Sequence, residues 1–340
     1  MKLKKGFLVS AVILTVILSG CQTTVSKNQE PQSNEEIVAA GKIEEEPLYG
    51  KTIKFGFPGA LCHTAVPLAK ELGYFEEEGL DIEIVSVENS VDSTGTGQTD
   101  VATTHIAHAL VPASNDVNLK FFESTQTGCQ SLLVMNDSEI TSTKDLEGKK
   151  VCIPLGIGSP DHNIVIRFLL RDGVDLNKIK FVPSDRAAVI QALETKEVDA
   201  ALLPDQFSET FRNEGKVRII RSITWDDDFK EEPCCIYMFN GDFIKNNPEH
   251  GKKIEKVIKK ANQYIEENMP QAAQQIVDNN LASGDYDLIL RNMETYDWTV
   301  TDEKVEETLL NVIEDYKKGG VLDSGVNTED LMKKIWMPLN

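Results

Sequence analysis

The chain has 340 residues, of which 26% are charged, and a formal net charge of −20. Such an acidic chain repels the phosphates of nucleic acids and anionic lipid headgroups, which excludes both as expected partners. A segment as long as residues 51–340 usually divides into more than one hydrophobic core, so two lobes are expected.

The first 20 residues predict an export signal. Three lysines precede an apolar run from Phe7 to Leu18, which is too short to cross a bilayer as a helix. The sequence LSGC at residues 18–21 resembles the lipobox of bacterial lipoproteins, which implies cleavage before Cys21 and a lipid on its thiol. The alternative is an ordinary signal peptide with an incidental cysteine.

Residues 21–50 are rich in Gln, Ser, Asn and Glu and have few large apolar side chains, which predicts a disordered tether. We expect the tether to be followed by a first lobe over 51–131, a second lobe over 132–232 and a return to the first lobe over 233–340.

The first lobe begins with alternating strands and helices. Strands are expected at 51–57, 81–87 and 118–125, a helix within 58–75, and a strand running into a helix over 100–111. This alternation predicts a parallel α/β sheet.

The second lobe repeats the pattern. We expect strands at 148–154, 178–183 and 198–204 and helices at 159–173 and 186–197, and the block closes near Arg221. A return strand at 233–240 then leads into helices, among them 252–268, whose apolar residues recur at helical spacing. Two crossovers therefore join the lobes, and hinges are expected near Gly128–Ser131 and Pro233–Cys235.

Binding sites in open α/β sheets lie beyond the carboxyl ends of the strands, which here face each other across a cleft. The candidate ligand-binding residues occupy those turns: Pro58, Gly59, Cys62, His63, Thr104, His105, Gly128, Cys129, Gly158, Ser159, Asp205 and Cys234. Ser159 and Pro160 also predict a helix start that attracts an anion or a polar oxygen, although a glycine-rich turn needs such residues for its backbone alone.

The chain has six cysteines, and five remain when Cys21 is assigned to the anchor. An odd remainder fits no complete disulfide framework, so mostly free thiols are expected. Strand alternation sends Cys234 and Cys235 to opposite faces, so at most one is expected at the cleft.

Four segments carry a family resemblance: PLAKELGYFEEEGLDIEIV, ITSTKDLEGKKVCIPLGIGS, ALETKEVDAALLPDQF and MFNGDFIKNNPEHGKK. They resemble the periplasmic-binding-protein family that serves nitrate, sulfonate, taurine and thiamine-precursor importers. The resemblance implies a type II two-lobed fold that closes on its ligand and docks on an ABC permease with its ATPase subunits. It implies an extracytoplasmic receptor that acts as a monomer, needs no cofactor and is not an enzyme.

The sequence departs from the anion-binding members. Sulfonate and nitrate sites usually recruit Arg or Lys, whereas the first-lobe turns here offer Cys, His, Thr and Gln, with Arg186 as the nearest cationic candidate. The segment PCCIYMFNGDFIKNNPE also looks like that of thiamine-pyrimidine-binding relatives and of the related pyrimidine synthase, where a longer cysteine cluster occurs. The expected ligand is therefore a small polar or heteroaromatic solute, such as a pyrimidine thiamine precursor.

Two alternatives stay open. Metal or metal-complex capture would use soft or borderline donors from several turns, namely Cys62, His63, His105, Cys129 and His162. A thiol enzyme would use Cys62 or Cys129 as nucleophile and a histidine as base. An enzyme like the pyrimidine synthase would need a fuller cysteine motif and an intracellular supply of cofactor, which the export signal opposes.

Overall fold

The computed structural model describes residues 41–339. The expected export signal, the lipidation site at Cys21 and most of the expected tether lie outside the described residues. Among residues 41–339, none of the helices combines the length and apolar character that a bilayer crossing requires.

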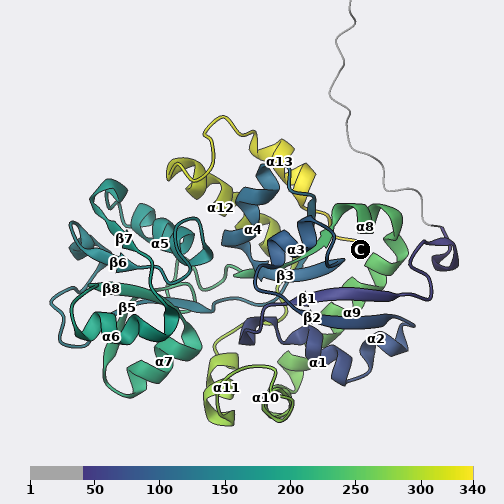
Figure 1. Ribbon diagram of the computed structural model, residues 1–340, viewed down its shortest axis with the longest axis horizontal. Helices are drawn as coiled ribbons and strands as arrows, with labels where there is room; N and C mark the ends of the chain where they lie inside the picture. Colours follow the sequence, from purple (N-terminus) through teal and green to yellow (C-terminus); the bar gives the residue numbers. More distant parts are fainter. Residues whose placement is uncertain (1–40, 340) are drawn as a thin grey trace, which may run out of the picture. The chain divides into compact units, whose positions relative to one another are not determined.

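The first sheet has the strand order β2-β1-β3-β10-β4. Its strands are β1 (Thr52–Phe57), β2 (Asp81–Ser86), β3 (Val101–His105), β4 (Leu119–Ser124) and β10 (Cys235–Asn240). The strands β1, β2 and β3 run parallel, whereas β10 runs antiparallel to both β3 and β4. We call this sheet and the helices packed on it the first lobe, and Figure 1 shows β1, β2 and β3 side by side within it.

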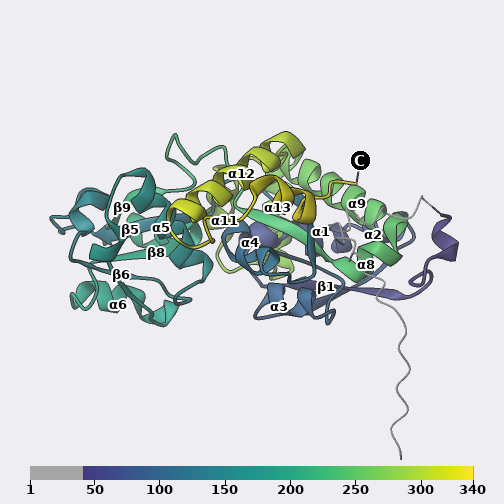
Figure 2. The same cartoon turned by 90° about the horizontal axis from the view of Figure 1, so that it is seen from above.

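The helices of the first lobe come from both ends of the described chain. They are η1 (Ile43–Glu45), η2 (Leu61–His63), α1 (Ala65–Glu71), α2 (Tyr74–Glu77), α3 (Ser90–Gly95), α4 (Ile106–Ser114), α8 (Gly241–Asn246), α9 (Pro248–Glu267), α10 (Met269–Asp278), α11 (Tyr286–Met293), α12 (Asp302–Lys318) and α13 (Thr328–Ile335). The long helix α9 packs against α1 and α2, while α12 and α13 pack against β4 and α4 (Figure 2).

The second lobe is built on a sheet of order β7-β6-β8-β5-β9. Its elements are β5 (Gln130–Met135), η3 (Thr143–Leu146), β6 (Lys150–Cys152), α5 (Pro160–Arg171), η4 (Leu176–Lys178), β7 (Lys180–Val182), η5 (Arg186–Ala188), α6 (Val189–Glu194), β8 (Ala200–Pro204), α7 (Asp205–Asn213) and β9 (Val217–Ser222). Here β5 runs antiparallel to both β8 and β9. The chain enters this lobe between β4 and β5 and leaves it between β9 and β10.

The expected α/β plan with two crossovers is confirmed, but the expectation of a parallel sheet is wrong because both sheets are mixed. A strand that returns from the other lobe enters its sheet from the opposite end, and it therefore runs antiparallel to its neighbours. Strands β5 and β9 were also not predicted. The residues of β5 are almost all buried and show no alternation, which is the pattern of a strand covered on both faces.

The core of the first lobe combines stacked aromatic rings with an apolar helix face. The rings of Phe122 on β4 and Phe239 on β10 stack with centroids 3.8 Å apart. The predicted apolar stripe of α9 is confirmed, since its members are all buried: Ile254, Val257, Ile258, Ala261 and Ile265.

Helix α5 of the second lobe contacts the first lobe directly. The amide Nδ2 of Asn163 donates to the carbonyl oxygen of Ala107 at 2.8 Å. The guanidinium of Arg167 bonds Asp315 on α12 at 3.0 Å and Glu232 in the second crossover at 2.8 Å. These polar contacts hold the two lobes against each other in this structure.

Glu123 on β4 gives a test of the packing. Its carboxylate is buried, and burial raises its pKa from 4.5 to about 7 although Lys259 opposes the shift. The folded state therefore binds the proton more tightly than the unfolded chain between about pH 4.5 and 7, so the free energy of unfolding should fall as the pH rises through that window.

We expect Glu123→Gln to remove this dependence, worth roughly 2–4 kcal/mol across the window. Urea unfolding of the wild type and of the variant from pH 4 to pH 8 measures it, with Glu83→Gln on the exposed edge of β2 as the control. Equal pH slopes for the wild type and Glu123→Gln would contradict the assignment.

Candidate functional site

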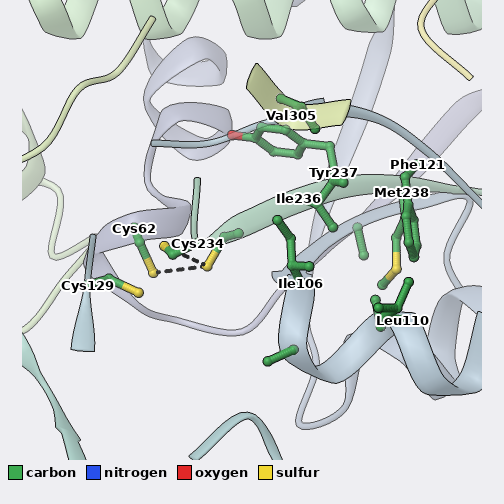
Figure 3. Packing of buried hydrophobic residues seen from close by; sticks show 14 of the residues in the cluster. Cys62, Ile106, Leu110, Phe121, Cys129, Cys234, Ile236, Tyr237, Met238 and Val305 are labelled. Carbon is green, nitrogen blue, oxygen red and sulfur yellow. Dashed lines mark hydrogen bonds between the residues drawn. The ribbon is translucent and has the colours of Figure 1, made fainter. Parts of the chain in front are cut away.

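Four thiols gather where the strand ends of the first lobe meet the two crossovers. Cys62 lies in η2 after β1, Cys129 lies just before β5, and Cys234 and Cys235 lie at the start of β10. All four are buried, and none forms a disulfide with another cysteine of residues 41–339. We call these residues the thiol cluster, and Figure 3 shows the labelled cysteines Cys62, Cys129 and Cys234 gathered at the start of β10.

The sulfur atoms of the cluster are in contact. The Sγ of Cys235 lies 3.8 Å from the Sγ of Cys62 and 3.4 Å from the Sγ of Cys234. The side chain of Gln126 donates from Nε2 to the Sγ of Cys234 at 3.3 Å. The cluster therefore joins the loop after β1 to both crossovers.

His63 is oriented toward the thiols. Its Nδ1 lies 2.9 Å from the hydroxyl of Thr103 on β3, and its Nε2 lies 3.8 Å from the Sγ of Cys235. A neutral ring that donates from Nδ1 to Thr103 presents an unprotonated Nε2 to the sulfur.

His105 has the opposite tautomer. It caps α4, and its Nδ1 accepts the backbone N–H of Ala107 at 3.0 Å. The proton of the neutral ring must then lie on Nε2, which is buried without a hydrogen-bond partner among the described residues. The Nε2–H group of His105 is thus a buried hydrogen-bond donor without an acceptor among the described residues, and it lies next to Cys129 and Cys234.

The thiol cluster favours charge separation. Hydrogen bonds from Cys129, Cys234 and Cys235 lower the pKa of Cys62 well below its ordinary value. Burial would lower the pKa of His63, but attraction to Cys62 and Cys235 outweighs it and raises that pKa to about 10. Burial lowers the pKa of His105 to about 3, so that ring stays neutral. A thiolate and an imidazolium side by side suit binding of a polar solute as well as nucleophilic chemistry.

The second lobe contributes a carboxylate. Asp205, at the start of α7, accepts the hydroxyl of Ser131 at 2.7 Å and a hydrogen bond from the hydroxyl of Thr224. It also accepts the backbone N–H of Cys129 at 3.2 Å. Burial raises the pKa of Asp205 to about 6, although these hydrogen bonds oppose the shift. Asp205 thereby fixes the crossover that carries Cys129.

The backbone at this crossover is strained. Gly128 and Cys129 both have positive φ values, 77° and 109°. A side chain with a Cβ rarely adopts that region, and Cys129 is held there by its N–H bonds to Asp205 and to the hydroxyl of Thr224.

A small cavity adjoins the cluster. It has a volume of about 20 Å³ and is lined by residues of both lobes, including His105, Cys234, Ile164 and Arg167. This volume holds about one water molecule or ion and is too small for an aromatic ring.

Several candidate residues lie elsewhere. Thr104 is buried on β3 and its hydroxyl faces Nδ1 of His108 at 3.4 Å. Ser159 caps α5 as expected, with its hydroxyl accepting the N–H of His162. Pro58, which is partly buried, and Gly59, which is exposed, follow β1, with Gly59 at a φ of 80°.

His162 does not join the other expected metal donors. Its Nδ1 accepts the N–H of Gly158 at 3.2 Å, and its ring packs edge-on against Phe181 with centroids 4.5 Å apart. The four remaining candidates, Cys62, His63, His105 and Cys129, lie in or beside the thiol cluster.

The expected separation of Cys234 and Cys235 is wrong. Strand β10 begins at Cys235, so Cys234 lies ahead of the strand and alternation does not apply to it. Cys235 was therefore missed as a site residue, and so were Thr103, Gln126 and Thr224, each of which bonds a site residue. These residues lie at or near strand ends beside candidate residues, and that position is what could have identified them. A single sequence does not show which of the many residues at such positions contact the site.

Comparison with known proteins gives the following similarities. The sequence matches the family described as NMT1/THI5 like over residues 61–273, which is more than half of the chain. It is 23% identical over 234 residues to the 4-amino-5-hydroxymethyl-2-methylpyrimidine phosphate synthase of Aspergillus parasiticus, covering 64% of this chain and 66% of that protein. The chain thus spans slightly less than two thirds of that relative's length.

Solved structures share the fold. The alkanesulfonate-binding protein SsuA from Xanthomonas axonopodis pv. citri superposes with a TM-score of 0.68 at 14% identity, covering 82% of this chain and 97% of that one. The nitrate-binding protein NrtA from Synechocystis PCC 6803 gives 0.67 at 14% identity, covering 84% and 86%. The expected periplasmic-binding-protein fold is thereby confirmed.

The expectation that the protein is not an enzyme is contradicted by the same comparison. Curated relatives from Aspergillus parasiticus and from two yeasts carry the name of a pyrimidine phosphate synthase, at 23–25% identity. This chain has fewer cysteines than the longer cluster of the synthase, but that difference does not exclude an enzyme.

Gly128 gives a test of the crossover geometry. A Cβ at this residue would lie 2.8 Å from the hydroxyl of Thr224 and 2.9 Å from the ring of Tyr296, whereas one at Gly215, with a similar positive φ of 72°, would meet nothing within 4 Å. We expect Gly215→Ala to cost about 1–2 kcal/mol of folding free energy and Gly128→Ala to cost clearly more. Equal losses of melting temperature in the two variants would show that the crowding at Gly128 does not matter.

Proposed function

We propose a function from the premise that the chain belongs to the NMT1/THI5-like family: it is an extracytoplasmic receptor that captures a small solute between its lobes and delivers it to an ABC permease. The observation that carries this proposal is the junction itself. His105 Nε2 and Gln126 Oε1 are buried polar atoms without a hydrogen-bond partner among residues 41–339, and they lie beside the thiols where both lobes and both crossovers meet. Unsatisfied buried groups at a lobe junction are what a ligand would satisfy.

The chemistry of the junction argues against a simple anion site. SsuA and NrtA carry the names of sulfonate and nitrate binding, and such ligands favour a free guanidinium. Here Arg167 lines the cavity, but its guanidinium is bonded to Glu232 and Asp315. Arg186, the expected cationic candidate, is exposed at the start of η5. A pyrimidine-like solute or a metal ion suits the sulfur and imidazole groups better, and a pyrimidine would require the lobes to open, because the cavity in this structure is too small for an aromatic ring.

Capture would proceed by closure of the lobes. We propose that the crossovers at 125–129 and 223–234 act as hinges and that opening breaks the bonds of Asn163 and Arg167 to the first lobe. The polar character of these bonds supports reversible closure, because water can replace each bond when the lobes part.

The place of action follows from the N-terminal sequence. We propose export by residues 1–20, lipid attachment at Cys21 and a monomer tethered to the outer face of the membrane beside its permease. The composition of residues 21–40 supports a tether that lets the receptor reach the transporter.

A ligand panel tests the proposal. Thermal unfolding of the full-length chain in mild detergent should be followed with thiamine pyrimidine precursors, sulfonates, nitrate and transition metals. A ligand at a hundredfold excess over its dissociation constant stabilises the fold by about 2.7 kcal/mol, which raises the melting temperature by several degrees.

Each sample should also be analysed by mass spectrometry. A stabilising solute that is recovered unchanged supports a receptor. Multiple turnovers of a stabilising solute into a product, as the synthase relatives suggest, would overturn it, and so would the absence of a shift with every member of the panel.

The anchor is tested separately. Cells that express the wild type in labelled palmitate should incorporate the label and retain the protein in the membrane fraction. The variant Cys21→Ala should lose the label, while Cys152→Ala, a buried cysteine of the second lobe, should keep it. Label in both variants would contradict attachment at Cys21.

A further inference from the structure

We propose that the captured solute is a thiophilic metal ion of the Zn²⁺ type, bound by Cys62, His63 and Cys235. This inference rests on the proposed capture at the lobe junction and names its cargo. It is carried by the spacing of the donor atoms, by the orientation of His63 and by the absence of carboxylates from this donor set.

The donor spacing fits a tetrahedral ion. Bond lengths of about 2.3 Å to sulfur and about 2.0–2.1 Å to nitrogen place the corners of a tetrahedron about 3.8 Å apart for two sulfurs and about 3.6 Å apart for sulfur and nitrogen. The distances from Cys235 Sγ are 3.8 Å to Cys62 Sγ and 3.8 Å to His63 Nε2. All three donor atoms lie within 4.8 Å of one another, so an ion can bind between them once Cys62 and His63 approach to the length of a tetrahedral edge.

Cys234 is a neighbour of the site and not one of its donors. It belongs to a second group, with His105 and Cys129, whose donor atoms lie within 4.8 Å of one another. Its Sγ donates a hydrogen bond to the Sγ of Cys235 at 3.4 Å, and Gln126 donates one to Cys234. Hydrogen bonds to ligand sulfurs are a common feature of metal–thiolate sites.

The two histidines have different roles. Thr103 can accept the Nδ1 proton of His63, so the Nε2 proton is the one that an incoming ion displaces, and this is the usual support of a ligating imidazole. His105 cannot ligate in the same way, because its Nδ1 accepts the N–H of Ala107 and its Nε2 carries the proton. The Nε2–H of His105 has no partner among the described residues and is available to donate to a neighbouring thiolate.

The chemistry of the donors selects the ion. Thiolate and imidazole favour Zn²⁺ and related borderline or soft ions, whereas Mg²⁺ and Ca²⁺ prefer oxygen ligands. The acidic group of the described residues that could hold an ion, Glu123, Glu255 and Asp302, is a separate site and is bridged by Lys259. The thiol cluster therefore discriminates against the abundant hard cations.

Metal binding can be measured without an assay of transport. The full-length chain in mild detergent, reduced and kept free of oxygen, should be titrated with Co²⁺ as a spectroscopic probe and with Zn²⁺ in competition. We expect one ion per chain, the charge-transfer absorption of a cobalt–thiolate centre, and its loss when Zn²⁺ is added.

Matched variants locate the site. Cys62→Ser, Cys235→Ser and His63→Gln should abolish the cobalt–thiolate absorption, whereas Cys152→Ser and His162→Gln, a buried thiol and a histidine outside the cluster, should leave it unchanged. Thr103→Val should weaken Zn²⁺ binding about 10- to 100-fold and Thr103→Ser should restore it. Circular dichroism of each variant shows whether it is folded.

The outcomes separate this inference from the proposed function. Folded wild type that binds no Co²⁺ or Zn²⁺, or that keeps the absorption in folded Cys62→Ser and Cys235→Ser, overturns the metal site. If an organic solute then stabilises the chain and is recovered unchanged, the receptor proposal stands with another cargo. If neither metal nor organic solute binds, both fail.

Discussion

The insertion of β10 between β3 and β4 is the constraint on which the site depends. The strand returns from the second lobe and runs antiparallel to both neighbours, with Cys235 opposite His105 and Ile236 opposite Thr104. This register brings the start of β10 to the carboxyl end of β3, beside the loop that follows β1. Two cysteines therefore meet Cys62 and His63, which are more than 170 residues away in the sequence.

The same constraint explains the chemistry of the junction. Two lobes and two crossovers exclude water from a small volume, so the hydrogen bonds among sulfurs and imidazoles are not replaced by solvent. Within that volume the partner of each ring fixes its orientation: Thr103 directs the Nε2 of His63 toward the thiols, and the N–H of Ala107 leaves the Nε2 of His105 as a donor. Asp205 fixes the strained backbone of Cys129 from the second lobe, so the cluster is coupled to the position of that lobe.

The α/β alternation, the apolar stripe of α9 and the capped start of α5 were predictable, because each depends on residues close together in the sequence. Strand β5 was not, since a short apolar run without alternation does not distinguish a strand from a buried helical turn. Binding sites in open α/β sheets lie beyond the carboxyl ends of the strands, and this rule predicted five of the residues near the junction: Cys62, His63, His105, Cys129 and Asp205. It could not show that Cys234 and Cys235 lie together, because that depends on where β10 begins and on its register.

X-ray absorption spectroscopy of the Zn²⁺-loaded, full-length chain tests the central claim most directly. The account predicts a first shell dominated by sulfur at about 2.3 Å, with one nitrogen at about 2.0–2.1 Å. A shell of oxygen and nitrogen alone, without sulfur, would show that the ion binds elsewhere and that the thiol cluster is not its site.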